Sequence, residues 1–161
     1  MSGRPGAVHP DEAGLRAGGD GGQVGSIEVL PFGLLTFAIG ALLVANAWAV
    51  VDARFATDAA AREAARTYVE GTGEQTALAD ALAVGRAALA GHGRSGEVRA
   101  TGPASGPRLE RCATVTFEAR LRVPALTLPL IGGYGRGFEV VSRHREVVDP
   151  YRDGLAGEPA C

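Results

Sequence analysis

The sequence predicts an α+β protein with a long N-terminal transmembrane helix that continues into an aqueous stalk, a second short helix, and a small antiparallel sheet of about three strands. Three observations lead to this prediction. Residues 29–51 contain no charged side chain. Residues 53–70 have high helix propensity and contain neither Gly nor Pro. Beyond residue 93 the period of the apolar residues changes to two, which is typical of strands.

The composition excludes several classes of function. A length of 161 residues suits about one domain. The net charge of -2 and the pI of about 5.9 provide no general attraction for nucleic acid. Two cysteines, Cys112 and Cys161, are too few for a disulfide scaffold and lack the clustered spacing of a zinc site. We therefore expect no nucleic-acid partner, no metal and no other cofactor.

The first element is a leader, residues 1–26. It consists mainly of Gly, Pro and charged residues, with almost no large apolar side chain. Such a segment cannot bury enough apolar surface to offset the entropy lost on ordering. The sequence therefore predicts that residues 1–26 are disordered.

The next element, residues 27–71, combines a membrane span with a stalk. As a helix, the 23 uncharged residues 29–51 would be roughly 34 Å long, enough to cross a hydrocarbon core of about 30 Å. Pro31 is expected in the first turn, and Trp48 near the far membrane interface. The alternatives are a buried helix of a soluble protein, or a cleavable signal peptide that ends at Ala45-Asn46-Ala47. The length of the apolar run and the helical pattern beyond it favour a retained anchor.

Charge leaves the orientation of this anchor open. Arginines after the span would place the C-terminal part in the cytoplasm by the positive-inside rule, but acidic residues lie among them. Along the same helix, Ala41, Ala45, Ala49 and Ala53 begin a row of small residues spaced by four. Such rows let membrane helices approach closely, so these alanines are candidates for helix packing.

Residues 72–149 are expected to form an α+β domain. The spacing of Thr72 and Gln75 predicts a capping box at the start of a helix that ends near Gly91. Alternating apolar residues predict strands over 97–101, 113–123 and 138–148, the last with a bulge where the alternation breaks. The two helices would cover the apolar face of the sheet.

Two segments of this region are expected to lack regular structure. GGYGRG, residues 132–137, lacks the spacing of a phosphate-binding loop and precedes a strand, so we interpret it as a flexible turn. Residues 150–161 are expected to be a flexible tail.

No arrangement of residues indicates catalysis. His9, His92 and His144 are isolated, and Glu110 and Glu118 lie eight residues apart on the expected solvated face of a strand. The sequence therefore predicts neither an enzyme nor a small-molecule substrate. If the C-terminal region is exported, Cys112 and Cys161 can form a disulfide.

The junction between leader and span carries a resemblance to a known family. Glu28 immediately precedes the apolar run, and DAAAREAARTYVEG follows it. Together these features resemble the TadE-like minor pilins of tight-adherence pilus systems, over residues 20–71. In that family a prepilin peptidase removes the leader after a Gly, and a Glu lies near the new N-terminus. The resemblance implies processing within Gly22, Gln23, Val24 and Gly25. Cleavage after Gly22 would leave Glu28 sixth, and cleavage after Gly25 would leave it third, whereas the usual position is fifth.

The same resemblance implies a location and a set of partners. The leader would be cytoplasmic, and the helix would lie in the plasma (inner) membrane. The pilin-like domain would be extracytoplasmic, with other pilins, pilus assembly proteins and the lipid bilayer as partners. Two competing hypotheses remain: a single-pass envelope protein that binds another protein and is unrelated to pili, and an exported enzyme behind a signal peptide.

Overall fold

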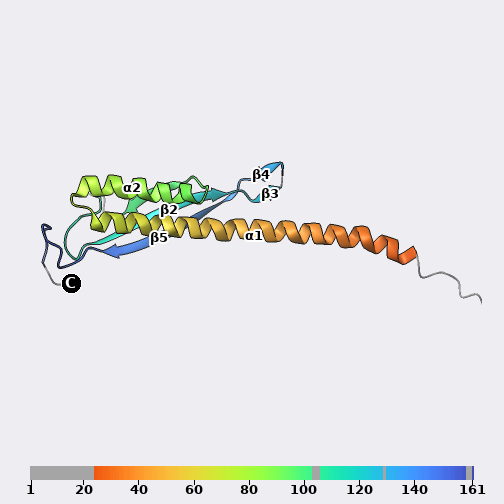
Figure 1. The fold of residues 1–161 in the computed structure, drawn as a ribbon, viewed down its shortest axis with the longest axis horizontal. Coiled ribbons are helices and arrows are strands. Elements are labelled where there is room, and N and C mark those ends of the chain that lie inside the picture. The colour runs from red at the N-terminus through yellow and green to blue at the C-terminus, as the bar shows by residue number, and fades with distance from the viewer. Residues whose placement is uncertain (1–23, 103–105, 129, 159–160) are drawn as a thin grey trace, which may run out of the picture. The chain divides into compact units, whose positions relative to one another are not determined.

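The computed structural model describes residues 24–102, 106–128, 130–158 and 161, with side chains from residue 29 onward. Residues 39–161 form one compact unit, and the described residues before them belong to a second. The elements, labelled in Figure 1, are α1 (Val24–Glu70), α2 (Glu74–Gly91), β1 (Glu97–Thr101), β2 (Thr114–Val123), β3 (Leu126–Leu128), β4 (Gly132–Tyr134) and β5 (Phe138–Val147). The structure is therefore α+β, with a long apolar N-terminal helix, a second helix and a small antiparallel sheet.

The long helix α1 begins at Val24, so residues 24–26 are helical although the sequence places them in the leader. Residues 1–23 lie outside the described part of the chain. Pro31 lies inside the helix instead of in its first turn. Proline removes a single backbone N–H and is tolerated in transmembrane helices, where neighbouring groups satisfy the freed carbonyl.

The main sheet has three antiparallel strands in the order β1-β2-β5. The pairing of β2 with β5 is continuous from Thr114 opposite Val147 to Val123 opposite Phe138, so the predicted bulge is wrong. The alternation breaks because Ser142 and His144 lie on the covered face of the sheet. Each has a polar partner there: Ser142 bonds the Thr57 hydroxyl of α1 at 2.8 Å, and His144 contacts Glu146 at 3.0 Å.

Part of the predicted flexible turn over residues 132–137 is a strand. β4 pairs antiparallel with β3, which makes a two-stranded hairpin. Glycines suit this hairpin for steric reasons: Gly132 has a φ of +101°, and a Cβ at Gly133 would come within 2.6 Å of the Pro124 ring. The glycines here allow close packing, so the prediction of a flexible turn is wrong for the residues of β4.

The start of α2 also differs from the prediction. Its N-cap is Gly73, which has no side chain to cap the helix, so the capping box of Thr72 and Gln75 does not form. The turn before it is tight, because a Cβ at Gly71 would come within 2.3 Å of the Ala77 Cβ. The connection after α1 therefore leaves no room for a side chain at position 71.

The core lies between the two helices and one face of the three-stranded sheet, where α2 runs beside the C-terminal part of α1 (Figure 1). Tyr68 of α1 packs on Phe117 of β2 with ring centroids 5.7 Å apart. Gly85 of α2 lies so close to Ala60 and Val98 that a Cβ there would come within 3.2 Å of the Ala60 carbonyl and 2.8 Å of Val98 Cγ1. The alanines of α1 are buried because the helix contacts both layers at short range.

The C-terminal segment is attached to the domain, although the sequence predicts a flexible tail over residues 150–161. Arg152 donates hydrogen bonds to the last carbonyls of α1, including that of Glu70 at 2.7 Å. It also donates to the carbonyl of Gly71, the residue that follows the helix, at 2.5 Å. The Arg111 amide donates to the Ala156 carbonyl at 2.8 Å. An arginine at a helix C-terminus satisfies carbonyls that have no partner within the helix, which explains the attachment.

Candidate functional site

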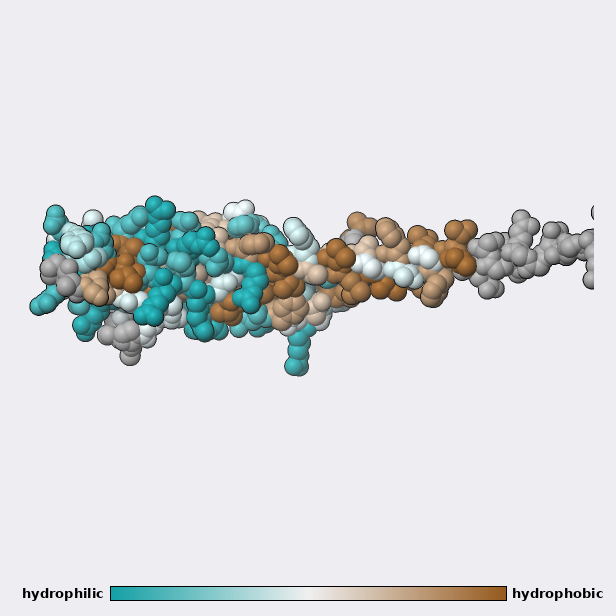
Figure 2. Space-filling view, turned by 90° about the horizontal axis from the view of Figure 1, so that it is seen from below, coloured by the Kyte–Doolittle hydropathy of each residue, from teal (hydrophilic) through white to brown (hydrophobic). Residues whose placement is uncertain are grey.

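The apolar stretch of α1 is the first candidate surface. Among the described residues, one helix is long and apolar enough to cross a membrane; it contains an 18-residue window of mean hydropathy 2.1, and the chain itself buries none of that window. Large side chains such as Phe32, Phe37 and Trp48 are mostly exposed. Figure 2 shows apolar residues in brown over this stretch, and more hydrophilic residues in teal elsewhere. An exposed apolar surface of this extent is typical of a membrane or protein contact.

The predicted row of small residues divides into two parts. Ala41 and Ala45 are exposed and Ala49 is half-buried, whereas Ala53 is fully buried in the chain's own core. Ala53 therefore cannot serve contacts between molecules, which corrects the prediction for this residue. Sequence spacing could not separate the two parts, because the row has the same period throughout.

The predicted processing region lies at the edge of the described structure. Gly22 and Gln23 fall outside the described residues, as does His9. Val24, Gly25 and Glu28 belong to the first turns of α1.

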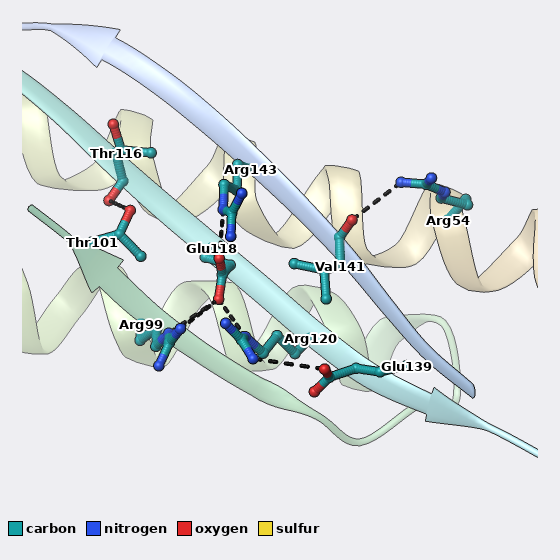
Figure 3. A network of polar contacts seen from close by, with 9 residues as sticks. All are labelled: Arg54, Arg99, Thr101, Thr116, Glu118, Arg120, Glu139, Val141 and Arg143. Atoms are coloured by element: carbon teal, nitrogen blue, oxygen red, sulfur yellow. Dashed lines mark hydrogen bonds and ion pairs between the residues drawn. The ribbon is translucent and has the colours of Figure 1, made fainter. Parts of the chain in front are cut away.

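The second candidate is an ionic cluster on the face of the sheet opposite the helices, centred on Glu118 of β2 (Figure 3). Glu118 lies directly opposite Arg99 of β1 and Arg143 of β5. Arg99 donates to its Oε1 from Nε at 3.0 Å and from Nη2 at 2.9 Å, and Arg143 Nε lies 2.5 Å from its Oε2. Arg120 also donates to Oε1, and contacts Glu139 at 3.6 Å.

Glu118 is fully buried, so its prediction as a solvated residue is wrong. The three arginine side chains cover the carboxylate, although Arg99 and Arg143 are themselves 46% and 65% exposed. The strand register brings Arg99 and Arg143 to Glu118, whereas Arg120 lies two residues further along the same strand. The available sequence signal was a Glu within an Arg-rich alternation, and it did not identify the cross-strand partners.

The electrostatics of the cluster follow from this geometry. Burial by itself raises the pKa of Glu118, but hydrogen bonds from Arg120, Arg143 and Arg99 outweigh it and lower the pKa to about 2. The carboxylate therefore stays ionised and has its oxygens occupied, so it is poorly suited to act as a general base. The cluster can order the sheet by joining its three strands.

A shallow depression of about 600 Å³ lies beside the cluster, lined by Arg54, Asp58, Arg120, Glu139, Val141, Ser142 and Arg143. Arg54 donates to the Val141 carbonyl at 3.1 Å, so this arginine of α1 is held at the edge of β5 (Figure 3). The lining contains no cysteine or histidine and combines cations with acids. It is a polar surface between α1 and the sheet edge.

The remaining candidates do not assemble into a reactive centre. Cys112 and Cys161 form a disulfide with a Cα–Cα distance of 5.4 Å. Glu110 pairs with Arg108 at 3.6 Å, and His92 is the C-cap of α2. Within the residues that the structure describes, no three His, Cys, Asp or Glu side chains are grouped as metal ligands.

Comparison with known proteins adds no identification: no family model, no curated protein and no solved structure matches this chain.

Proposed function

We propose that the protein is a single-pass plasma-membrane protein that acts as a TadE-like minor pilin in the assembly of a tight-adherence pilus. The observation that carries this proposal is the apolar stretch of α1, which the chain leaves uncovered while it buries the second half of the same helix in its own domain. A helix of this kind suits a lipid environment and, during assembly, a bundle of neighbouring pilin helices.

The exchange from lipid to pilin helices uses the exposed part of the small-residue row. Ala41 and Ala45 allow a neighbouring helix to approach closely, whereas larger residues on other sides of α1 remain in contact with lipid or further subunits. After removal of the leader, Glu28 neutralises the new N-terminal amine of a neighbouring subunit. That charge pair sets the register between subunits as they leave the membrane.

The domain from residue 72 onward lies on the extracytoplasmic side in this proposal. The disulfide between Cys112 and Cys161 supports that orientation, because such bonds persist mainly in oxidising compartments. The arginines that follow the span do not prevent it, since long segments are translocated largely regardless of nearby charge.

Mass spectrometry and N-terminal sequencing of the protein purified from the membrane fraction test the proposal. A mature N-terminus within residues 23–26, as expected, would support a processed pilin. A chain that keeps its leader would instead identify an unprocessed envelope anchor, and a chain that begins at Trp48 would identify a secreted domain.

A matched pair of variants tests the role of Glu28 separately. Glu28→Ala is expected to insert in the membrane normally and to impair pilus formation. Glu63→Ala changes an exposed acid on the stalk half of α1 and should leave assembly intact. Equal pilus yields from the two variants would refute the register role.

A further inference from the structure

The β3–β4 hairpin (Leu126–Tyr134) contacts α1 at a residue of the uncharged stretch. The side-chain amide of Asn46 donates to the Thr127 carbonyl at 3.3 Å, and its oxygen accepts from the Thr127 amide at 2.6 Å. Asn46 also donates to the Leu42 carbonyl at 2.8 Å. These bonds satisfy the polar groups of Asn46 within the protein, as a polar side chain near lipid requires.

The level of this contact relative to the membrane follows from the first charged residues after the span. Asp52 pairs with Arg94 at 2.7 Å, and Arg94 also donates to the Ala49 carbonyl at 3.2 Å. Asn46 lies six residues before Asp52, roughly 9 Å along the helix axis. Apolar faces of interfacial helices lie about 5–10 Å deep at the boundary between headgroups and acyl chains. In a bilayer whose surface lies at the level of Asp52, Asn46 would hold Thr127 at the depth of that boundary.

The tip of the hairpin has the composition of a membrane contact. Leu130 is fully exposed and has a positive φ of 71°, a conformation that is unfavourable for a residue with a Cβ. Ile131 beside it is 66% exposed, and Tyr134 of β4 is half exposed. In Figure 1 the hairpin lies beyond the end of the three-stranded sheet, alongside α1. Two apolar residues at a tip and a tyrosine behind them match the order of side chains across a membrane interface.

We propose that this hairpin is a second membrane contact, in which Leu130 and Ile131 enter the interfacial layer of the leaflet from which α1 emerges and Asn46 holds the hairpin at that depth. The inference rests on the membrane span of the proposed function. With two contacts, the helix and the hairpin, the external domain has a defined height and rotation above the bilayer.

Tryptophan fluorescence of the full chain in phosphatidylcholine and phosphatidylglycerol vesicles tests this inference. A Trp48→Phe background carries one new tryptophan, either Ile131→Trp at the hairpin tip or Tyr151→Trp as the control. Tyr151 is an exposed residue of the C-terminal segment, 81% accessible. Lipids brominated on their acyl chains report contact with the bilayer, and acrylamide reports contact with water.

The tryptophan at position 131 is expected to be quenched several-fold more by brominated lipid, and several-fold less by acrylamide, than the one at position 151. Asn46→Leu in the same chain should reduce the lipid quenching at 131, and unchanged quenching would overturn the role of Asn46. Quenching at 131 by acrylamide alone would overturn the inference. Protection from both quenchers would also overturn it, and would point to a protein partner or a second copy of the chain.

Native Trp48 distinguishes failure of the hairpin from failure of the proposed function. If brominated lipid quenches Trp48 in the unmodified protein but not the tryptophan at 131, the span holds and the hairpin inference falls. If Trp48 is not quenched in reconstituted vesicles, the membrane span fails, and the hairpin inference fails with it.

Discussion

Replacement of Glu118 by Gln tests whether the charge of this carboxylate stabilises the sheet through the ionic cluster. The substitution keeps the size of the side chain and removes the charge that faces Arg99, Arg120 and Arg143. Those arginines would then repel one another across three adjacent strands, with Glu139 at 3.6 Å from Arg120 as a remaining acid. We expect the sheet to lose stability near neutral pH.

The size of this loss of stability follows from the pKa of Glu118. Its lowering from 4.5 to about 2 sets an upper limit of about 3.5 kcal/mol, at about 1.4 kcal/mol for each pKa unit. Solvent screens part of this attraction, because the guanidinium groups of Arg99 and Arg143 are substantially exposed. We therefore expect a loss of about 1–2 kcal/mol in the free energy of unfolding.

The pH dependence has a definite sign. Because the pKa of Glu118 is lower in the folded protein than in the unfolded chain, the unfolded chain binds more protons between the two values. The contribution of Glu118 to the free energy of unfolding is therefore fully present above pH 4.5 and is lost as pH falls towards about 2. The difference between wild type and Glu118→Gln should shrink over the same range.

Urea unfolding of the full chain in non-ionic detergent, followed by far-ultraviolet circular dichroism, measures these differences. Glu139→Gln is the matched control, and its effect should be much smaller because Glu139 has one long contact at the surface. A Glu118→Gln variant as stable as wild type near neutral pH would refute the reasoning. So would a loss that persists unchanged at about pH 2.

Three further predictions concern packing and the C-terminal segment. Gly85→Ala should destabilise the domain by about 1–3 kcal/mol in the same assay, whereas Gly91→Ala, where a Cβ meets nothing within 4 Å, should not. Cys161→Ser should lower stability by about 2–4 kcal/mol, because the bond with Cys112 closes a separation of 49 residues; mass spectrometry after alkylation without reduction should find no free thiol in wild type. Tyr68→Phe should lower the free energy of unfolding by about 1 kcal/mol, because it removes the 2.7 Å hydrogen bond from the Tyr68 hydroxyl to the Pro107 carbonyl. Burial raises the pKa of Tyr68 from 10.0 to about 12, so wild type should lose stability between these pH values, and ultraviolet absorbance should show that the variant lacks one late-ionising phenol.

Local patterns in the sequence are sufficient for the fold class and for most of the elements. The absence of charge over residues 29–51 and the alternation over 113–123 are properties of neighbouring residues, and they remain visible whatever the chain contacts later. The long helix, the second helix and the three main strands were therefore predictable. The disulfide was predictable only as a possibility, because sequence leaves the distance between Cys112 and Cys161 open.

Tertiary structure decided the features that depend on contacts between distant segments. Glu118 is buried because the strand register places Arg99 and Arg143 opposite it. Ala53 is buried while Ala45 is exposed, although both belong to one row, because α2 and the sheet cover only part of α1. The β3–β4 hairpin lies beside Asn46 through bonds across 81 residues of sequence. Periodicity identifies which face of an element is apolar, but the partner of that face is determined only when the whole chain packs, since burial and ion pairing depend on neighbours in space.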